Sequence, residues 1–363
     1  MPVCKIYTGR TVLEITGYLE EYPEIFIVAD RNVAHYAGSL AEELSTVRGE
    51  SFSDRILLLE ATERNKTMDT VLDICGWLLE KGADRKALVL TMGGGITTDM
   101  AGFAASIYKR GIRSAYVPTT LLAQADAAIG GKTGVNFGNY KNMLGIIRQP
   151  EFTFICPEVL GTLPYRDLLS GAAEMLKTFI IDNSGDNYRR ALEILSEIHR
   201  SPDRRKAIGD RLSEIRDLAG AAAGIKAGVV ERDEFEQDER RKLNLGHTFA
   251  HAIEHEARER SADISHGEAV AMGIVMAAKV SEKYFGGDSE GHPRTKPDLS
   301  ETISNDFLAC GLPVNCPFPV SSLVESMGKD KKAEGGHINF VLIRAIGDVR
   351  IVPLNVDEAL KYL

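Results

Sequence analysis

The sequence has few cysteines, and no two of them stand at a spacing that binds metal or forms a redox motif. Cys4, Cys75, Cys156, Cys310 and Cys316 are odd in number and scattered, and no CxxC pair occurs. This usage argues against a disulfide framework and favours reduced thiols that act as small buried hydrophobic side chains.

Long apolar runs and an excess of basic residues are also missing. No apolar run reaches the roughly 18 residues that a membrane helix needs, and the opening MPVCKIYTGR lacks the apolar core of a signal peptide. The formal charge is −9, whereas binding to a nucleic-acid backbone depends on clustered Lys and Arg. We therefore expect a cytoplasmic protein that binds neither membrane nor nucleic acid. An anionic ligand would have to bind in a local basic pocket.

The sequence shows no internal repeat, no low-complexity segment and no long disordered tract. Its 363 residues exceed the usual size of one domain. We expect two folded domains, the first over residues 1–161 and the second over residues 162–363.

Short apolar, β-branched runs recur in the first half and predict buried strands. They are IFIVAD (25–30), RILLLE (55–60), ALVLTM (87–92), SAYVPT (114–119) and FTFICP (152–157). Stretches with helical spacing lie between them, such as 67–81, where one face is predicted to carry Val71, Leu72, Cys75, Leu78 and Leu79. The alternation predicts an α/β sheet with crossover helices, and the glycine-rich stretch 130–145 predicts a hairpin or loop at a ligand-binding cleft.

The second half has a different pattern. Segments rich in Ala and Leu with charged spacers run from 166 to 285 and predict a mainly helical domain. Near the end, 337–354 predicts two strands around a Gly-Asp turn. The polar stretch 286–298 predicts an exposed loop.

A glycine-rich turn occupies TMGGGITTDMAGFAAS (91–106), directly after a predicted strand and before a helical segment. Such a turn lets the backbone approach a pyrophosphate at the amino end of a helix. The spacing is not GxGxxG, so the same glycines also fit a tight strand-to-helix turn without a ligand. Asp30, at the end of a predicted strand, fits either a ribose ligand or an ordinary helix cap.

Four of the eight histidines fall within twenty residues, three of them in LNLGHTFAHAIEH (243–255) and one in ISHGEAV (264–270). His247, His251 and His255 are spaced i, i+4, i+8 along one helical stripe, so two of them could share a divalent metal. A histidine stripe in the core or on the surface is the alternative, and it is weakened by His266 in the second cluster. Glu174 lies in an apolar helical context, where it fits either a metal ligand or an i, i+3 ion pair with Lys177.

Several basic residues stand beside glycine, asparagine or apolar residues rather than among mixed surface charges, which suggests a pocket for a multiply anionic ligand. They are Lys132, Lys141, Lys177, Lys226 and Arg240, with Asn142 and Asn244 close to them in the sequence. For any one of these lysines a solvated surface position is the alternative.

Taken together, these motifs resemble the 3-dehydroquinate synthase family over most of residues 25–345. The matching strings are MGGGITTDMAGFAASIYKRGI, VPTTLLAQADAAIGGKTGVN, YKNMLG, SGAAEMLKTFI, ERDEFEQDERRKLNLGHTFAHAIEH and SHGEAVAMGI. The resemblance implies an amino-terminal Rossmann-like NAD-binding α/β domain, a mainly α-helical carboxy-terminal metal-binding domain and a homodimer. Ala250 departs from the pattern, because the family commonly has glycine there.

The resemblance also implies roles for individual residues. The metal, Zn²⁺ with Co²⁺ as the alternative, would be bound by Glu174, His247 and His266. The substrate would be surrounded by Asp126, Lys132, Lys141, Asn142, Lys177, Lys226, Arg240, Asn244 and His251. Arg110 of the neighbouring subunit would reach the substrate's phosphate, and one of Lys331 or Lys332 would also contact it. The NAD⁺ site would comprise Asp30, Glu60, Lys66, Gly94, Gly95, Asp99, Thr119, Thr120, Lys132, Lys141 and Thr162.

The implied reaction converts 3-deoxy-D-arabino-heptulosonate 7-phosphate to 3-dehydroquinate and phosphate, in the shikimate pathway to aromatic amino acids. It proceeds by transient oxidation with NAD⁺, phosphate elimination, re-reduction, ring opening and intramolecular aldol closure. Three alternatives are another sugar-phosphate cyclase, a metal-dependent polyol dehydrogenase and an NAD-binding regulatory protein without activity. The intact matched positions disfavour the third, and the basic residues disfavour the other two.

Overall fold

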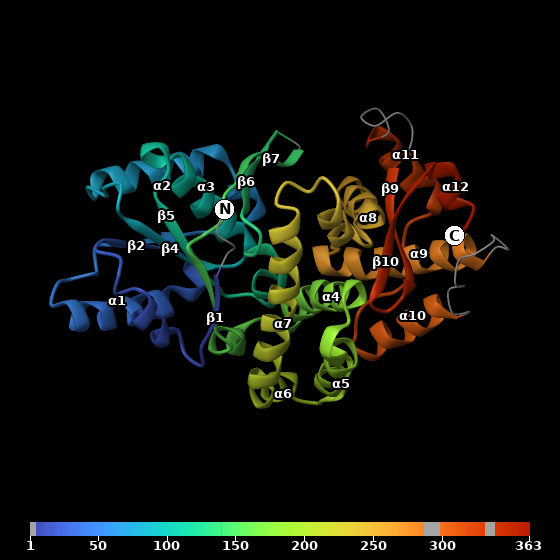
Figure 1. Cartoon of the computed structure of the whole chain (residues 1–363), viewed down its shortest axis with the longest axis horizontal. Helices are drawn as coiled ribbons and strands as arrows, with labels where there is room; N and C mark the ends of the chain where they lie inside the picture. Colours follow the sequence, from blue (N-terminus) through green and yellow to red (C-terminus); the bar gives the residue numbers. More distant parts are fainter. Residues whose placement is uncertain (1–4, 139, 287–297, 331–337) are drawn as a thin grey trace. The chain divides into compact units, whose positions relative to one another are not determined.

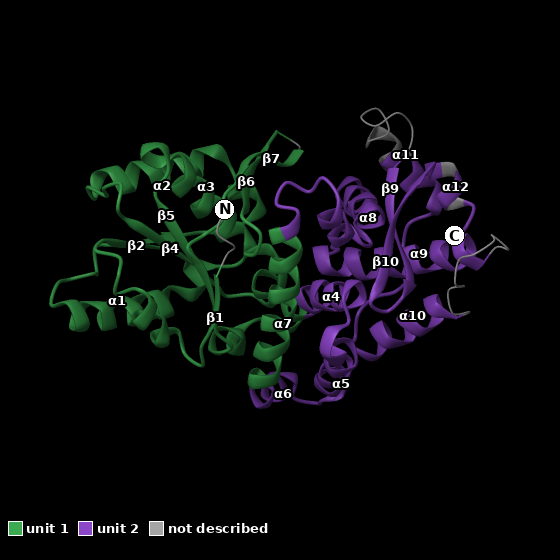
Figure 2. Cartoon of the chain, viewed as in Figure 1, with its two compact units in different colours: residues 1–168, 212–231 green, residues 169–211, 232–363 purple. Residues whose placement is uncertain are grey.

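The computed structural model describes residues 5–138, 140–286, 298–330 and 338–363, in two compact units (Figure 2). Unit 1 is Met1–Leu168 with Leu212–Glu231, and unit 2 is Leu169–Arg211 with Arg232–Leu363. These units differ from the predicted division after residue 161 in two ways: unit 1 extends to Leu168, and it includes nearly all of α7 (Leu212–Arg232). The buried Lys226 of α7 ties this helix to unit 1, because its Nζ donates to the backbone oxygen and to Oδ1 of Asp126.

Unit 1 is built on a six-stranded parallel sheet with the order β1-β8-β5-β4-β2-β3. The strands are β1 (Lys5–Thr8), β2 (Ile25–Asp30), β3 (Ile56–Leu59), β4 (Leu88–Gly93), β5 (Arg113–Pro118) and β8 (Phe152–Ile155). Continuous apolar runs form the central strands because both faces of a parallel sheet are covered. The five predicted strands are confirmed, and β1 is an additional strand at the edge.

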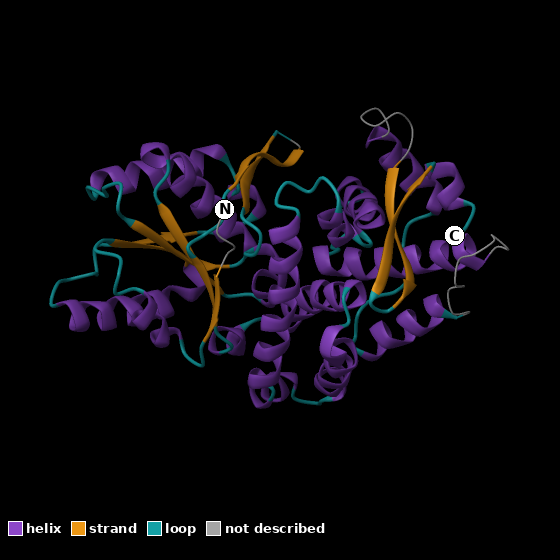
Figure 3. Cartoon of the chain, in the orientation of Figure 1, coloured by secondary structure: helices purple, strands orange, loops and turns teal. Residues whose placement is uncertain are grey.

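Helices cover both faces of this sheet (Figures 1 and 3). They include α1 (Ala34–Arg48), α2 (Met68–Glu80) and α3 (Gly95–Ile107). The predicted face of α2 is partly wrong, because Leu72 and Leu79 are 54% and 65% exposed. The buried stripe instead consists of Val71, Ile74 and Leu78, spaced i, i+3, i+7, and it packs against the sheet together with α3.

A separate antiparallel ribbon, β6 (Lys132–Phe137) with β7 (Tyr140–Ile147), confirms the predicted hairpin. The shorter helices of unit 1 are η1 (Val12–Tyr18), η2 (Arg31–Val33), η3 (Glu63–Asn65), η4 (Tyr108–Arg110), η5 (Ala123–Ala127) and η6 (Glu158–Thr162).

Unit 2 is mainly helical, as predicted. It contains most of α4 (Tyr165–Ile181), and η7 (Ser184–Asp186), α5 (Asn187–Arg200), α6 (Arg204–Asp210), η8 (Glu239–Asn244), α8 (His247–Glu259), α9 (His266–Gly286), α10 (Leu299–Ala309), α11 (Val320–Asp330) and α12 (Val356–Leu360). The predicted terminal strands are β9 (Ile338–Ala345) and β10 (Asp348–Leu354), joined through Gly347 at a φ of 90°.

Two predictions fall beyond the described ranges. The predicted loop 286–298 lies outside them except at its ends, and so do Lys331 and Lys332. Across the residues that the structure describes, no helix is both long and apolar enough to cross a membrane.

Candidate metal centre and nucleotide-binding turn

Three helices of unit 2 bring Glu174, His247 and His266 together. Nε2 of His247 lies 3.6 Å from Oε1 of Glu174, and Nε2 of His266 lies 3.3 Å from the same oxygen. Tight glycine contacts place the two histidines at helix starts. Gly246, at a φ of 78°, packs so closely against α9 that a Cβ would overlap Ile274, and a Cβ on Gly267 would overlap the backbone of α4.

The geometry of this cluster fits a divalent metal ion. One ligand atom from each residue lies within 4.8 Å of the others, as expected of donors that each bind one ion at about 2.0–2.2 Å. Glu174 is fully buried, and neither of its carboxylate oxygens has a hydrogen bond of normal geometry within the described residues. A buried carboxylate needs compensating positive charge, and the oxygen that faces the two imidazoles could share a cation with them.

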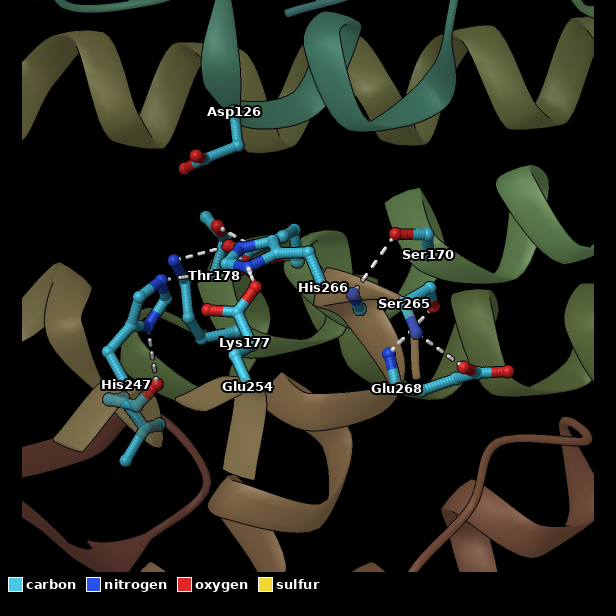
Figure 4. A network of polar contacts seen from close by, with 12 residues as sticks. Asp126, Ser170, Lys177, Thr178, His247, Glu254, Ser265, His266 and Glu268 are labelled. Carbon is cyan, nitrogen blue, oxygen red and sulfur yellow. Dashed lines mark hydrogen bonds and ion pairs between the residues drawn. The ribbon is translucent and has the colours of Figure 1, made fainter. Parts of the chain in front are cut away.

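The Nδ1 atoms of His247 and His266 each lie beside a hydrogen-bond acceptor (Figure 4). Nδ1 of His247 lies 3.2 Å from the backbone oxygen of Leu245, and Nδ1 of His266 lies 3.4 Å from Oε1 of Glu254. Such contacts leave Nε2 of each ring for a metal and orient the ring. Sequence analysis missed Glu254, although its position seven residues after His247 places it on the same face of α8 and was the available signal.

Lys177 makes an ion pair with Oε2 of Glu174, and its side chain is also buried. Burial alone would raise the pKa of Glu174, but Lys177 together with His247 and His266 lowers that pKa well below its usual range. The two predicted roles of Glu174, metal ligand and ion-pair partner of Lys177, are therefore compatible. One carboxylate oxygen faces Lys177, and the other faces the two imidazoles.

The two imidazoles differ in charge. Burial and the charge of Lys177 lower the pKa of His247 to about 3, which leaves its ring neutral and able to bind a metal. Burial would lower the pKa of His266, but the carboxylates of Glu174 and Glu254 raise it to about 10. Without a metal, the protonated His266 supplies positive charge between these carboxylates, and metal binding has to displace that proton.

The predicted histidine stripe contributes only one residue to this group. The ring of His251 is exposed and lies 5.5 Å from the ring of His247 in an edge-to-face arrangement. Nδ1 of His255 lies 3.9 Å from Oε1 of Glu256. The second histidine of the group comes from α9 instead.

In unit 1 the strand-to-helix turn between β4 and α3 has the form of a phosphate cradle. Gly94 is the N-cap of α3 and has no side chain, so the cap itself does not satisfy the first amides of the helix, where an anion could bind. A Cβ on Gly93 would overlap Thr97, and a Cβ on Gly94 would lie 3.1 Å from Thr120. The backbone nitrogen of Thr119 donates to the oxygen of Gly93 at 2.9 Å, which brings Thr119 and Thr120 beside the turn.

Other candidate nucleotide residues of unit 1 differ in their surroundings. Oδ1 of Asp30 accepts from the backbone nitrogen of Asn32 at 2.9 Å, so this carboxylate does act as a cap. Nζ of the buried Lys66 lies 2.5 Å from both Oδ2 of Asp99 and Oδ1 of Asn142. Burial raises the pKa of Asp99 to about 6, against the lowering effect of Lys66. Glu60 and Thr162 are exposed at the ends of β3 and η6.

The candidate substrate residues are divided between the two units. Unit 1 has Arg110, Asp126, Lys132, Lys141, Asn142 and Lys226, and unit 2 has Lys177, Arg240, Asn244 and His251. Arg240 is buried and donates through Nη1 to the backbone oxygen of Glu234 at 2.5 Å, while Nδ2 of Asn244 donates to Oε1 of Glu236 at 2.6 Å. Both are therefore anchored by the segment that precedes α8.

A solved structure has the same fold. The 2-epi-5-epi-valiolone synthase from Streptomyces hygroscopicus subsp. jinggangensis, with NAD⁺ and Zn²⁺ bound, matches 100% of this chain and 96% of its own, with a TM-score of 0.81 and 25% identity. This likeness, with the parallel sheet of unit 1 and the carboxylate and two imidazoles of unit 2, defines the class as the sugar-phosphate cyclases.

The sequence comparisons identify the family within that class. The domain described as 3-dehydroquinate synthase N-terminal matches residues 56–170, and the corresponding C-terminal domain matches residues 171–333. The 3-dehydroquinate synthase of Parabacteroides distasonis is 37% identical over 331 residues, which cover 91% of this chain and 87% of the relative. That of Thermococcus kodakarensis is 42% identical over 297 residues, covering 82% and 76%. The chain belongs to the 3-dehydroquinate synthase family.

Proposed function

We propose that the protein is a 3-dehydroquinate synthase, a lyase that converts 3-deoxy-D-arabino-heptulosonate 7-phosphate to 3-dehydroquinate and phosphate in the shikimate pathway. The observation that carries the proposal is the group Glu174, His247 and His266, with Glu174 buried and both histidines partly exposed, in a chain of this family that also has a glycine turn at the start of α3. The cofactors are NAD⁺ and a divalent metal, Zn²⁺ or alternatively Co²⁺.

Glu174, His247 and His266 would hold the metal, and three protein ligands leave a coordination position for substrate. When bound, the metal supplies Lewis-acid polarisation of a substrate hydroxyl, and NAD⁺ supplies a reversible hydride acceptor. The turn at Gly94 and Gly95, with Thr119 and Thr120 beside it, would bind the pyrophosphate at the amino end of α3.

The basic side chains would bind and orient the anionic substrate. Lys226 is held by Asp126, and Arg240 by the backbone of Glu234, so each cation is fixed before a ligand arrives. Fixed cations stabilise developing negative charge without reorganising during the reaction. They also hold the substrate in one orientation, which the elimination and the final ring closure require. His251, exposed beside His247, is the proposed proton-transfer residue.

The proposal includes a cytoplasmic homodimer, in which Arg110 reaches the phosphate site of the neighbouring subunit. Arg110 is exposed, and its backbone is held at a φ of 69° in the turn after α3. A left-handed residue other than glycine persists only where surrounding contacts impose it. An exposed guanidinium at a turn is accessible to a ligand of another subunit.

The proposal is tested by measuring phosphate release from 3-deoxy-D-arabino-heptulosonate 7-phosphate with purified protein, NAD⁺ and Zn²⁺, before and after chelation. We expect phosphate and 3-dehydroquinate to appear, chelation to stop both, and absorbance to show no net NADH. Phosphate release from a different sugar phosphate would instead identify another cyclase of the class. Accumulating NADH with a simple polyol would identify a dehydrogenase.

A further inference from the structure

The ribbon β6–β7 contains a bulge opposite Asn136. On β6 the pairing passes from Val135 to Phe137, while on β7 it passes from Leu144 to Tyr140. Lys141, Asn142 and Met143 therefore oppose the single residue Asn136, and the backbone of Asn142 takes a φ of 52°. Bulges redirect side chains next to functional sites. This one determines where the candidate substrate residues Lys141 and Asn142 lie.

Asn136 replaces the hydrogen bond that the ladder loses at the bulge. Its Oδ1 accepts from the backbone nitrogen of Asn142 at 2.9 Å. Its own backbone nitrogen donates to the oxygen of Lys66 at 2.9 Å, and its Nδ2 donates to Oε1 of Glu63 at 2.8 Å. Asn136 therefore joins the bulge to the segment Glu63–Lys66, which lies far from the ribbon in sequence.

The side chain of Lys66 joins the bulge to α3 through a second set of hydrogen bonds. Its Nζ lies 2.5 Å from Oδ1 of Asn142 and 2.5 Å from Oδ2 of Asp99. Asn142 is thus held at its backbone by Asn136 and at its side chain by Lys66. A two-stranded ribbon is only marginally stable by itself. Val135 and Leu144 pack one part of this ribbon against the core of unit 1, and these hydrogen bonds fix the bulged part.

We propose that Asn136 is a positioning residue that couples cofactor binding to the geometry of Lys141 and Asn142. The inference rests on the proposed function, in which Lys66 and Asp99 belong to the NAD⁺ site and the bulge belongs to the substrate site. NAD⁺ contacts that fix Lys66 and Asp99 also fix the bulge through Asn136, and by reciprocity a fixed bulge strengthens NAD⁺ binding.

The test uses the full chain and NAD⁺ as the probe, and measures hydrogen–deuterium exchange of peptides from 132–147 with and without NAD⁺. In the wild type we expect NAD⁺ to slow exchange of the ribbon about tenfold, within the usual range of coupling between sites. In Asn136→Ala we expect this NAD⁺-dependent slowing to fall below about twofold, with NAD⁺ still bound when its concentration is raised.

Two further variants separate positioning from general damage. Asn136→Asp combined with Glu63→Gln keeps the acceptor for Asn142 and reverses the donor and acceptor toward residue 63, so it should restore the slowing. Phe137→Ala removes a neighbouring side chain that is 61% exposed and should leave the slowing as in the wild type.

Kinetics provide a second readout, because loss of positioning should raise KM for the sugar phosphate in Asn136→Ala about tenfold while kcat changes less than about threefold. Equal NAD⁺-dependent slowing in wild type and Asn136→Ala, or none in the wild type, would overturn the inference. Absence of phosphate release by the wild type would overturn the proposed function instead, and the exchange measurement would still decide the role of Asn136.

Discussion

Glu174 and Lys177 form an ion pair in which both side chains are buried. Breaking such a pair by removing one partner leaves an uncompensated charge, which typically costs about 3–5 kcal/mol, whereas replacing both partners costs little. The ion pair therefore keeps the carboxylate of Glu174 ionised, and removing that carboxylate should lower the free energy of unfolding. In the proposed centre, metal binding and folding stability would depend on the same carboxylate, and substitutions can separate the two effects.

We expect Glu174→Gln to lose the metal and, in chelated protein, to lower the free energy of unfolding by ~3 kcal/mol, because the buried Lys177 loses the carboxylate with which it pairs. Adding Lys177→Met should recover most of that stability without recovering metal. Urea unfolding and elemental analysis measure the two effects. A double variant as unstable as Glu174→Gln would show that the pair does not account for the loss.

Oε1 of Glu254 lies 3.4 Å from Nδ1 of His266, so Glu254 would support the proposed metal centre without being a ligand. Removing such a partner commonly weakens metal affinity by about 10–100-fold. We expect Glu254→Gln to do so in a competition assay with a chromophoric chelator. The exposed Glu259 on the same helix provides the matched control, and Glu259→Gln should leave the affinity unchanged. Equal effects of both substitutions would indicate a loss of general surface charge rather than of a specific contact.

Asp99 should make folding stability depend on pH. Burial raises its pKa from 3.8 to about 6, despite the opposing effect of Lys66. The folded state then holds a proton that the unfolded state releases between about pH 4 and 6, so this residue contributes less stability as pH rises through that window. Asp99→Asn lacks this contribution. Relative to wild type, its free energy of unfolding should rise by ~2 kcal/mol from pH 4 to pH 6.5, measured by urea unfolding. If the free energies of unfolding of wild type and Asp99→Asn changed equally with pH, the raised pKa of Asp99 would be contradicted.

At the scale of elements, the predictions that succeeded were those that depend on local sequence. The apolar runs predicted β2 and β4, and the glycines predicted the turn before α3, because strand burial and tight turns leave local patterns. The place of α7 in unit 1 depends instead on contacts between distant residues, such as that of Lys226 with Asp126, a hundred residues away.

The candidate site was predictable to a similar degree. Residue types and spacings pointed to Glu174 and to the two histidine clusters, and the family resemblance implied the set Glu174, His247 and His266. The bulge opposite Asn136 depends on pairing between two strands, which strand periodicity does not predict. Helical periodicity places Glu254 on the face of His247, but it does not predict the contact of Glu254 with His266 of another helix. The exposed Leu72 and Leu79 show the same limit, because an apolar residue is not always an inward-facing one.

The turn between β4 and α3 should tolerate no Cβ at Gly93, because it would overlap Thr97 in the first turn of α3. We expect Gly93→Ala to shift the helix start and to raise the Kd for NAD⁺ at least about tenfold, in line with the 1–3 kcal/mol of overpacking. Isothermal titration calorimetry measures this change. Metal content should remain that of the wild type, since the metal ligands belong to unit 2. Unchanged NAD⁺ affinity would remove the turn from the proposed cofactor site.

At the scale of the whole molecule, the formal charge of −9 repels an anionic substrate. Affinity must therefore come from individual cations held in place, and a homodimer would add Arg110 of one subunit to the site of the other. An arrangement of this kind makes each active site depend on residues of two chains, and closed two-fold symmetry makes the two sites equivalent.

Subunit mixing tests that dependence. Arg110→Ala and His251→Ala should each lower activity strongly, and both residues are exposed, so neither change should disturb the fold. If Arg110 acts in the neighbouring subunit, a heterodimer of the two variants has one site with both residues intact and one with neither. Random exchange of an equal mixture makes about half of the dimers heterodimers. Activity should therefore return to about a quarter of the wild-type value after exchange, measured as phosphate release, with light scattering to verify the dimer. A mixture that stays inactive although exchange is complete would place Arg110 in the site of its own subunit.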